Sequence, residues 1–425
     1  MRKYLFLLFI PILLLNGCNT AEPVTTEPVK KPGILVEQVE GIPEEFLLGA
    51  DISRRIALEN SGMVYRDFDG REQDLVKILK DAGLNAIRVR VWKDPYDAAG
   101  NGYGGGNCDM EKAIEIGKRA MTYGMTLLVD FHYSDFWADP GKQQPPKAWE
   151  GLSLSRKTTE IQSYTTQCLQ EFSDAGITVS MVQVGNETTG GFCGEWTVEG
   201  QYTLMAAAAC AIRSFDPDIQ IAVHYTNPEK GGYTTFARRL QDYRVDYDIF
   251  ASSYYPAWHG TLDNLTRQLK AVAEGYGKQV MVAETAWDKI SYDANDQGAY
   301  AYSVQGQATA INELVKSVNQ IGDPAVGVFY WEPAWIELPD TDWEERSRIW
   351  ERYGTGWASS YAGEYDPEDA GKYYGGSACV NHALFDENGC PLESLMTFRY
   401  LRTGEAQHQP KVDQSTFETI YSTKP

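Results

Sequence analysis

The chain has 425 residues, of which 43% are apolar and 23% are charged, and this balance excludes intrinsically disordered and fibrous proteins. Its 38 basic and 59 acidic residues give a formal net charge of −21, which repels phosphate backbones and argues against a nucleic-acid partner. The 11 Trp and 26 Tyr fit either a sugar-binding protein, in which flat rings stack on pyranoses, or a large aromatic core.

The N-terminal residues have the pattern of an export signal. Two basic residues precede the apolar run 4–15, which is too short to span a bilayer comfortably. The run ends in LNGC, which resembles the bacterial lipobox, whose cysteine is acylated. We therefore expect residues 1–18 to be a lipoprotein signal peptide and Cys18 to carry the lipid. The protein is then exported and held at the cell surface through its lipid anchor only, since no later stretch predicts a transmembrane helix. The alternative is an ordinary signal peptide cut nearby.

Further segments follow the signal peptide. Residues 19–40 are rich in Pro, Thr and Glu and predict a flexible tether. We expect residues 41–405 to form one catalytic domain and residues 406–425 to form a C-terminal tail. No feature points to an obligate oligomer, so we expect a monomer. The later cysteines show no CxxC spacing, which argues against a zinc site, and Cys379 and Cys390 are candidates for a local disulfide.

Short β-rich runs recur along the chain with amphipathic helical stretches between them. The runs cover residues 46–51, 84–91, 125–131, 181–186, 219–225, 247–255, 279–284 and 326–331. Residues 73–82 and 109–123 are examples of the helical stretches, and Asp109 is a candidate N-cap of the second. This alternation predicts an α/β protein with a parallel sheet that closes into a (β/α)₈ TIM barrel. The alternative is an open doubly wound sheet, but no GxGxxG motif follows the first run.

The fourth and seventh runs lead into glutamates. MVQVGN is followed by Glu187, and QVMVAE ends at Glu284. The carboxyl ends of barrel strands converge on the face that carries active sites. Two carboxyl groups that face each other across a cleft meet the need of glycoside hydrolysis, in which one donates a proton and the other is ionised. A single glutamate at a strand end is more often a salt-bridge partner, but this pair favours catalysis.

Longer motifs make the pattern specific. They are NAIRVRVWKDPYDAAGNGYGGGN (85–107), LLVDFHYSDFWADPGKQQPPKAW (127–149), MVQVGNETTGG (181–191), VDYDIFASSYYPAWHGTLDNL (245–265), VMVAET (280–285), SVQGQA (303–308), GVFYWEPAW (327–335) and YGTGWASSYAGEYDPEDAGKYYGGSA (353–378). In these motifs the chain resembles glycoside hydrolase family 53, the arabinogalactan endo-β-1,4-galactanases. The resemblance implies a (β/α)₈ fold and retaining endo-hydrolysis of β-1,4-galactosidic bonds in pectin side chains by double displacement, which releases galactooligosaccharides.

The resemblance also assigns catalytic roles. Glu187 matches the acid/base, Glu284 matches the nucleophile, and Asn186 matches an asparagine that hydrogen-bonds the sugar 2-hydroxyl. Arg88 and Arg90 have the same parity on the second run, so both are expected to point into the barrel. A nearby cation lowers the pKa of a carboxylate. We favour Arg90 as the cation that holds Glu284 ionised, and a salt bridge within the barrel is the alternative for both arginines.

Other residues near the ends of the runs are candidate substrate contacts. They are Asp51, Trp92, His132, Asp135, Trp137, Tyr255, His259 and Trp331, with Trp287, Trp335 and Trp357 as either outer-subsite or packing residues. The first group of tryptophans are candidate sugar platforms, and the resemblance places Trp331 at the floor of the cleavage subsite. Tyr255 matches an aromatic residue that can hydrogen-bond the nucleophile. Both aspartates have the alternative role of structural hydrogen-bond acceptors.

The calcium loop of bacterial relatives is not matched in this chain. The segment 285–307 lacks an Asp-Gly-rich run, and Val380 stands where the resemblance places a ligand aspartate. Because calcium takes six to eight oxygen ligands, we expect no cofactor and a family calcium site that is absent or altered. A different site built from Asp288, Asp293 and Asp296 is the alternative.

Two alternatives to the galactanase stay open. One is a non-catalytic surface glycan-binding lipoprotein on a barrel scaffold, and the other is a related enzyme that cuts β-1,4-mannan or glucan. The presence of both glutamates favours an enzyme, because a protein that only binds glycan needs neither. We therefore expect β-1,4-galactan to be the partner of this chain.

Overall fold

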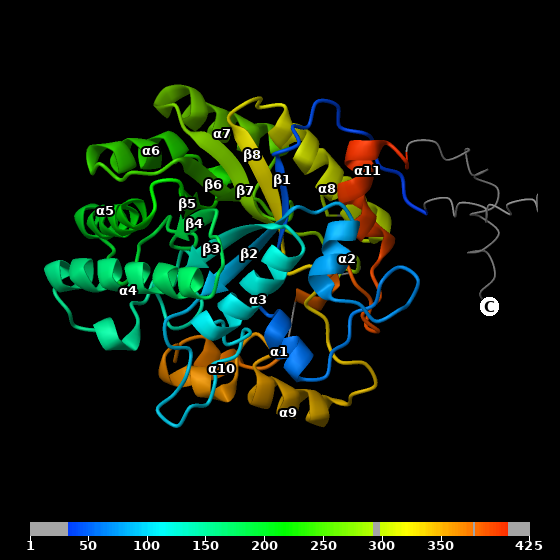
Figure 1. Cartoon of the computed structure of the whole chain (residues 1–425), viewed down its shortest axis with the longest axis horizontal. Coiled ribbons are helices and arrows are strands. Elements are labelled where there is room, and N and C mark those ends of the chain that lie inside the picture. Colours follow the sequence, from blue (N-terminus) through cyan, green and yellow to red (C-terminus); the bar gives the residue numbers. More distant parts are fainter. Residues whose placement is uncertain (1–32, 292–297, 377–378, 407–425) are drawn as a thin grey trace, which may run out of the picture. The chain divides into compact units, whose positions relative to one another are not determined.

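Parallel strands close into a barrel in chain order, from β1 round to β8 (Figure 1). The strands are β1 (Leu47–Asp51), β2 (Ala86–Val91), β3 (Thr126–Phe131), β4 (Met181–Val184), β5 (Gln220–Tyr225), β6 (Ile249–Ser253), β7 (Gln279–Thr285) and β8 (Ala325–Trp331). This computed structural model describes residues 33–291, 298–376 and 379–406. The predicted (β/α)₈ barrel is confirmed, and every strand begins and ends within two residues of its predicted bounds.

Helices lie outside the barrel (Figure 1), where α1 to α8 lie between strands in chain order and α9, α10 and α11 follow β8. The helices are α1 (Arg55–Asn60), α2 (Leu75–Asp81), α3 (Met110–Thr122), α4 (Leu154–Asp174), α5 (Val198–Phe215), α6 (Tyr233–Asp242), α7 (Leu262–Tyr276), α8 (Val304–Asn319), α9 (Trp343–Tyr353), α10 (Ala370–Tyr373) and α11 (Thr397–Thr403). Asp109 is the N-cap of α3, as predicted, because its side chain accepts a hydrogen bond from the Lys112 N–H. Helix α2 begins later than predicted, because Asp74 accepts the Val76 N–H and caps it.

The barrel interior changes from apolar to polar along the strands. Its lower end is filled by Ala86, Leu128, Met181, Ala222, Ile249, Ala251, Met281, Ala283 and Phe329. Gly49 makes room for this packing, since a Cβ there would lie 2.2 Å from the ring of Phe329. Two positions further along β2, β3 and β4, the inward side chains are Arg88, Asp130 and Gln183, which are all buried. The polar layer therefore lies directly below the carboxyl ends of the strands.

The predicted tether over residues 19–40 extends too far. Ile34, Val36 and Val39 are 2%, 2% and 6% exposed and belong to the main core. The Val39 N–H also donates to the carbonyl of Leu401 in α11, at 2.8 Å. The alternation of apolar residues at 34 and 36 is a strand-like pattern, which the Pro- and Thr-rich composition around it concealed. Residues 1–32, which include the predicted signal peptide and Cys18, and residues 407–425 lie outside the described residues.

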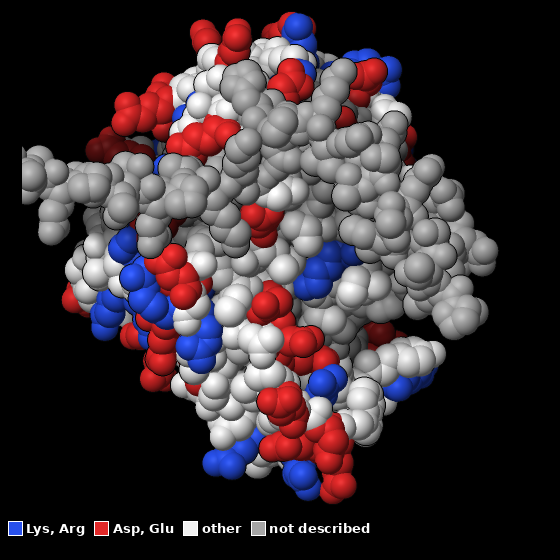
Figure 2. All heavy atoms as spheres, turned by 90° about the vertical axis from the view of Figure 1, so that its right-hand side faces the viewer, with Lys and Arg blue, Asp and Glu red and all other residues white. Residues whose placement is uncertain are grey.

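Two further observations concern the surface and the cysteines. Figure 2 shows acidic and basic side chains interspersed on the described part of one face. Within the described ranges, no helix is long and apolar enough to cross a bilayer. Cys390 is a free thiol, and the side chain of Cys379, its candidate disulfide partner, lies outside the described part of the chain.

Candidate active site

The carboxyl ends of the strands surround a cleft of about 300 Å³ that holds both candidate glutamates. The cleft is lined by Arg88, Arg90, His132, Trp137, Ala138, Asp139, Lys142, Asn186, Glu187, Tyr255, Glu284, Trp331, Trp357 and Asp369. Glu187 follows β4 and Glu284 lies in β7, and β5 and β6 separate these two strands in the barrel. The structure therefore brings together the two carboxyl groups, as the sequence predicts.

Glu187 is held in a strained turn after β4. Its φ is +46°, a left-handed conformation that is uncommon for a residue other than glycine and is found at functional sites. One carboxylate oxygen accepts a 2.6 Å hydrogen bond from the Ser253 hydroxyl at the end of β6. Burial, followed by the negative charge of Glu284, raises the pKa of Glu187 to about 8. Glu187 is therefore protonated at neutral pH and suited to donate a proton.

Glu284 has a different environment, in which a cation and a hydrogen-bond donor face its carboxylate. The Arg88 Nη2 lies 2.9 Å from Oε1 of Glu284, and the Tyr255 hydroxyl donates to Oε2 at 3.0 Å. Burial, with the charges of Asp130 and Asp51, raises the pKa of Glu284 above its usual value, and the Arg88 cation and the Tyr255 hydrogen bond oppose this rise. The two carboxyl groups thus share one cleft but differ in charge partners, which is how paired acids are given different roles.

Arg88, and not Arg90, is the arginine on the candidate nucleophile. Besides Glu284, its guanidinium pairs with Asp51 and Asp130, each at 2.9 Å. Arg90 pairs instead with Glu332, with 2.8 Å between Nη1 and Oε1. The prediction that Arg90 holds Glu284 ionised is therefore wrong. Strand parity places both arginines inside the barrel, but it does not tell which layer of carboxylates each one meets.

Asn186 is fixed beside the two glutamates. Its Oδ1 accepts a hydrogen bond from Arg88 Nη2 at 2.9 Å, and its Nδ2 donates to the carbonyl of Ala138 at 2.8 Å. A hydrogen bond of 3.0 Å also joins its Oδ1 to Nδ1 of His224, which is buried on β5. Asn186 lines the cleft as predicted, with its amide orientation set by three neighbours.

Four of the predicted substrate contacts line the cleft. Trp137 and Trp331 are half-buried, and their ring centroids are 6.1 Å apart. Tyr255 lies at the nucleophile, as already described. His132 also reaches the cleft but is only 2% exposed, because Trp92 donates to its Nδ1 and its Nε2 lies 3.0 Å from Asp130.

Trp92 and Asp51 were predicted to contact substrate but do not line the cleft. Trp92 is 0% exposed and lies under Trp137, with 5.1 Å between ring centroids. Asp51 is also 0% exposed, and its carboxylate pairs with Arg88 and accepts the hydroxyl of Ser53. Both predictions are therefore wrong, because the residue at the end of a strand can point down into the polar layer as well as up into the cleft.

Asp135 and His259 are also structural residues. Asp135 accepts the backbone N–H groups of Asp94 and Lys147, at 3.0 and 2.7 Å, and so joins the loops after β2 and β3. His259 accepts the backbone N–H of Tyr255 at 3.0 Å, which places it behind the tyrosine and out of the cleft. The predicted direct contact of these two side chains with substrate is wrong, although His259 helps to position Tyr255.

Lys142 and Asp369 line the cleft without having been predicted. The Lys142 ammonium group pairs with Asp366 at 3.0 Å and with Asp369, and it lies 5.2 Å from the ring centroid of Trp357. These residues come from the loops after β3 and β8, far apart in the chain. The acidic segment YDPEDAGK, which contains Asp366 and Asp369, could have suggested polar cleft residues. No local sequence pattern indicates that Lys142 lies beside it.

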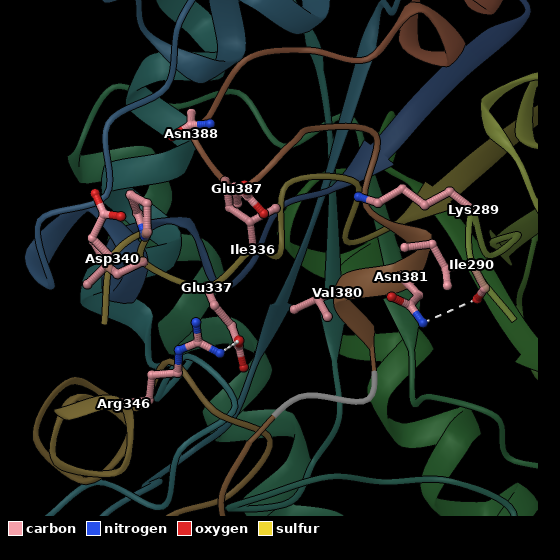
Figure 3. A pocket seen from close by; sticks show the side chains of 12 residues that line it. Lys289, Ile290, Ile336, Glu337, Asp340, Arg346, Val380, Asn381, Glu387 and Asn388 are labelled. Carbon is pink, nitrogen blue, oxygen red and sulfur yellow. Dashed lines mark hydrogen bonds and ion pairs between the residues drawn. The ribbon is translucent and has the colours of Figure 1, made fainter. Parts of the chain in front are cut away.

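A second cavity of about 430 Å³ lies between the loops that follow β7 and β8 (Figure 3). Lys289 reaches into it, and its ammonium group donates to the carbonyl of Phe385 at 3.0 Å. Asn381 donates to the carbonyl of Ile290 at 3.2 Å, which joins the same two loops. Within the described ranges, no group of three His, Cys, Asp or Glu side chains is placed to hold a metal ion. The Lys289 charge opposes a cation in this cavity, whereas Asp293 and Asp296 lie outside the described residues.

Comparison with known proteins decides the family. Residues 47–398 match the sequence model of Glycosyl hydrolase family 53. The chain belongs to glycosyl hydrolase family 53. It is similar to an endo-β-1,4-galactanase of Bacillus subtilis (strain 168), with 54% identity over 392 residues that cover 89% of this chain and 90% of the relative. This family 53 chain is therefore a glycoside hydrolase, and the two glutamates in its cleft are the candidate catalytic pair.

Solved structures agree with the family 53 assignment. A catalytic domain of family 53 from Ignisphaera aggregans matches with a TM-score of 0.77 and 34% identity, covering 87% of this chain and 99% of that chain. A fungal β-1,4-galactanase structure matches with a TM-score of 0.67 and 28% identity, covering 82% and 98% of the two chains. The match spans the barrel and so includes the cleft described above.

Ser253→Ala is expected to move the basic limb of the pH profile of this family 53 enzyme upward. The serine hydroxyl stabilises the ionised form of Glu187, so its loss raises a pKa that is already about 8. Activity requires the protonated acid and is lost as pH rises through that pKa. The measurement is kcat/KM against pH for wild type and variant. A basic limb that stays in place or moves to lower pH contradicts the assignment of Glu187 as the acid.

Proposed function

We propose that this chain is a retaining endo-hydrolase of β-1,4-galactosidic bonds in galactan and arabinogalactan side chains of pectin. The observation that carries the proposal is the pair of buried carboxyl groups, Glu187 and Glu284, in one aromatic cleft, of which only Glu284 has a cation on its carboxylate. The similarity to the Bacillus subtilis endo-β-1,4-galactanase supports galactan as the substrate. The half-buried rings of Trp137 and Trp331 offer flat apolar surfaces for pyranose rings.

The first chemical step forms a covalent intermediate. A carboxylate oxygen of Glu284 bonds to the anomeric carbon while the bond from that carbon to the glycosidic oxygen breaks. Glu187 gives its proton to the departing oxygen, which leaves as a sugar hydroxyl. Arg88 and Tyr255 hold both oxygens of Glu284 before the reaction. The nucleophile is thereby oriented, and little reorganisation is needed in the transition state.

The second step releases the sugar with its original anomeric configuration. Glu187, now ionised, takes a proton from water, whose oxygen bonds to the anomeric carbon while the bond to Glu284 breaks. Asn186 is positioned on the same side of the cleft as Glu187 and is fixed by Arg88 and Ala138. We assign to it a hydrogen bond to the 2-hydroxyl of the reacting sugar, an interaction that strengthens in the transition state.

The proposal is tested by incubating the protein with β-1,4-galactan and following reducing ends and the anomeric proton signals of the first products. The expected result is galactooligosaccharides of several lengths that are released in the β configuration. Products that first appear as the α anomer contradict retention. Parallel incubations with β-1,4-mannan and β-1,4-glucan test whether the chain is instead a related enzyme that cuts one of those polymers. Galactan binding without product release, in wild type as in Glu284→Gln, supports a glycan-binding protein instead.

We expect hydrolysis without calcium or any other cofactor. Lys289 places a positive charge between the two loops after β7 and β8, and protein hydrogen bonds join these loops. Dialysis against EDTA is therefore expected to leave both the galactanase rate and the melting temperature unchanged. Added calcium is the matched control. A loss of activity or stability in EDTA that calcium restores contradicts this expectation.

The location of the enzyme is a further part of the proposal. We infer that Cys18 is acylated after removal of the residues before it, and that the monomeric enzyme acts at the cell surface through this anchor. The supporting observation is the apolar run that ends in LNGC. Labelled palmitate is expected to enter the full-length chain in a bacterial host but not the Cys18→Ala variant. Equal labelling of both chains, or of neither, contradicts the anchor.

A further inference from the structure

A second buried ion pair lies beside the one that holds the nucleophile. Arg90 Nη1 and Glu332 Oε1 are 2.8 Å apart, and both side chains are 1% exposed. Neither side chain has an assigned part in the chemistry. A buried ion pair often adds no net stability over well-packed apolar residues, because both charges lose their hydration. Stability alone therefore does not account for this pair, and its contacts point to another role.

Arg90 lies against the floor of the cleft, by which we mean the two half-buried tryptophans, Trp137 and Trp331. Its guanidinium carbon is 4.4 Å from the ring centroid of Trp137, within the range of a cation–π contact. Its Nη2 donates to the carbonyl of Gly105 at 2.7 Å, and its backbone N–H donates to the Ser53 hydroxyl. Gly105 touches the same ring, since a Cβ there would lie 2.9 Å from Trp137. Arg90 is thus fixed at several points and fixes the position of Trp137.

Glu332 fixes the backbone beside Trp331, the second tryptophan of the floor. It follows Trp331 directly and has a left-handed φ of +48°, so the chain turns sharply after the tryptophan. Its backbone N–H donates to the carbonyl of Asp51, and its carbonyl accepts the N–H of Trp335, each at 3.1 Å. The side chain of Glu332 is held by Arg90. One ion pair therefore links the turn that carries Trp331 to the arginine under Trp137.

We propose that Arg90 and Glu332 are positioning residues that hold Trp137 and Trp331 as one rigid platform for the galactosyl units. This inference rests on the proposed function, because it takes the galactan chain to be the ligand of the platform. Arg88 and Glu284 form the ion pair that sets the charge of the nucleophile. The pair of Arg90 and Glu332 sets the shape of the surface on which the sugar lies.

A double-mutant cycle tests the coupling between the ion pair and the platform. Glu332→Gln removes the charge with little change of shape, and Trp137→Ala removes the ring. Each single variant is expected to raise KM for galactan about tenfold with less than a threefold change in kcat. This pattern is expected because the platform binds the ground state and the transition state equally well. The double variant is expected to match Trp137→Ala alone, because residues that act as a unit are not additive. Glu337→Gln, which breaks an ion pair between the loop after β8 and Arg346 of α9, is the matched control and is expected to leave KM unchanged.

Several outcomes overturn the proposal. The first is additive effects in the cycle, and the second is unchanged kinetics in Glu332→Gln. The third is a fall in kcat with a shifted acid limb of the pH profile, because this result means that the ion pair acts on the charge of Glu284. If Glu332→Gln does not fold, Glu332→Asp keeps the charge and is expected to give a smaller rise in KM, and no rise overturns the proposal. If wild type does not cut galactan, the proposed function fails by itself. The positioning role is then read from the near-ultraviolet circular dichroism of the tryptophans, which Glu332→Gln must change and Glu337→Gln must not.

Discussion

Glu284→Gln is expected to lower kcat on galactan by about 10⁴-fold or more, because the amide cannot form the covalent bond to the anomeric carbon. The variant is expected to fold, since glutamine fills the same space and its amide can still accept a hydrogen bond from Tyr255. KM is expected to change little, because the platform of Trp137 and Trp331 is untouched. The measurement is reducing-sugar release with the melting temperature taken in parallel.

Glu187→Gln is the matched variant, and it separates the two roles. Loss of the acid is expected to slow cleavage of galactan as strongly, but much less with an activated aryl galactoside, whose leaving group needs no proton. The basic limb that reflects a pKa of about 8 is expected to disappear from its pH profile. Azide is expected to give a β-galactosyl azide with this variant, since the covalent intermediate still forms. Wild-type rates in either variant contradict the double-displacement mechanism.

The sequence was enough to predict the barrel and the catalytic pair, for a physical reason. Parallel strands are buried on both faces, so their apolar runs stand out from the helices between them. Closure of the barrel then brings every strand end to the same face. Glu187 and Glu284 could be predicted because each comes at the end of such a run.

The residues that were predicted wrongly show where this reasoning ends. Arg88 and Arg90 are indistinguishable by parity, and only the positions of Asp51, Asp130 and Glu332 decide which carboxylate each arginine meets. These contacts depend on how deep each side chain lies in the barrel and on the turn at Glu332 after β8. A local sequence pattern predicts neither.

The aromatic residues show the same limit in the loops. Trp92 and Trp137 both follow strands and both looked like sugar platforms. One lies beneath the other, and Gly105, at positive φ in the glycine-rich loop, packs against both rings. A Cβ at Gly105 would lie 2.6 Å from Trp92. The close approach of the Gly105 backbone to the rings thus helps to decide that Trp92 is buried and Trp137 lines the cleft. Composition does not reveal such a contact.

Arg88 is the centre of the buried charge network, and its removal is expected to have the second large effect. Its guanidinium pairs with Glu284, Asp51 and Asp130, and it also donates to Asn186. Arg88→Met leaves these carboxylates without their cation, and breaking a buried pair in this way costs about 3–5 kcal/mol of stability. We expect a large fall in melting temperature together with a fall of about 10²-fold or more in kcat/KM.

The pH profile separates the effect of Arg88 on the reaction from its effect on folding. Arg88 lowers the pKa of Glu284, so its loss raises that pKa. Glu284 must be ionised to react, so the acid limb of kcat/KM moves to higher pH, and part of the lost rate returns as pH rises. Arg88→Lys keeps one charge but loses the fork that reaches several carboxylates, and is expected to shift the limb less. An acid limb that stays in place in a folded Arg88→Met variant contradicts the role of Arg88 as the counter-charge of the nucleophile.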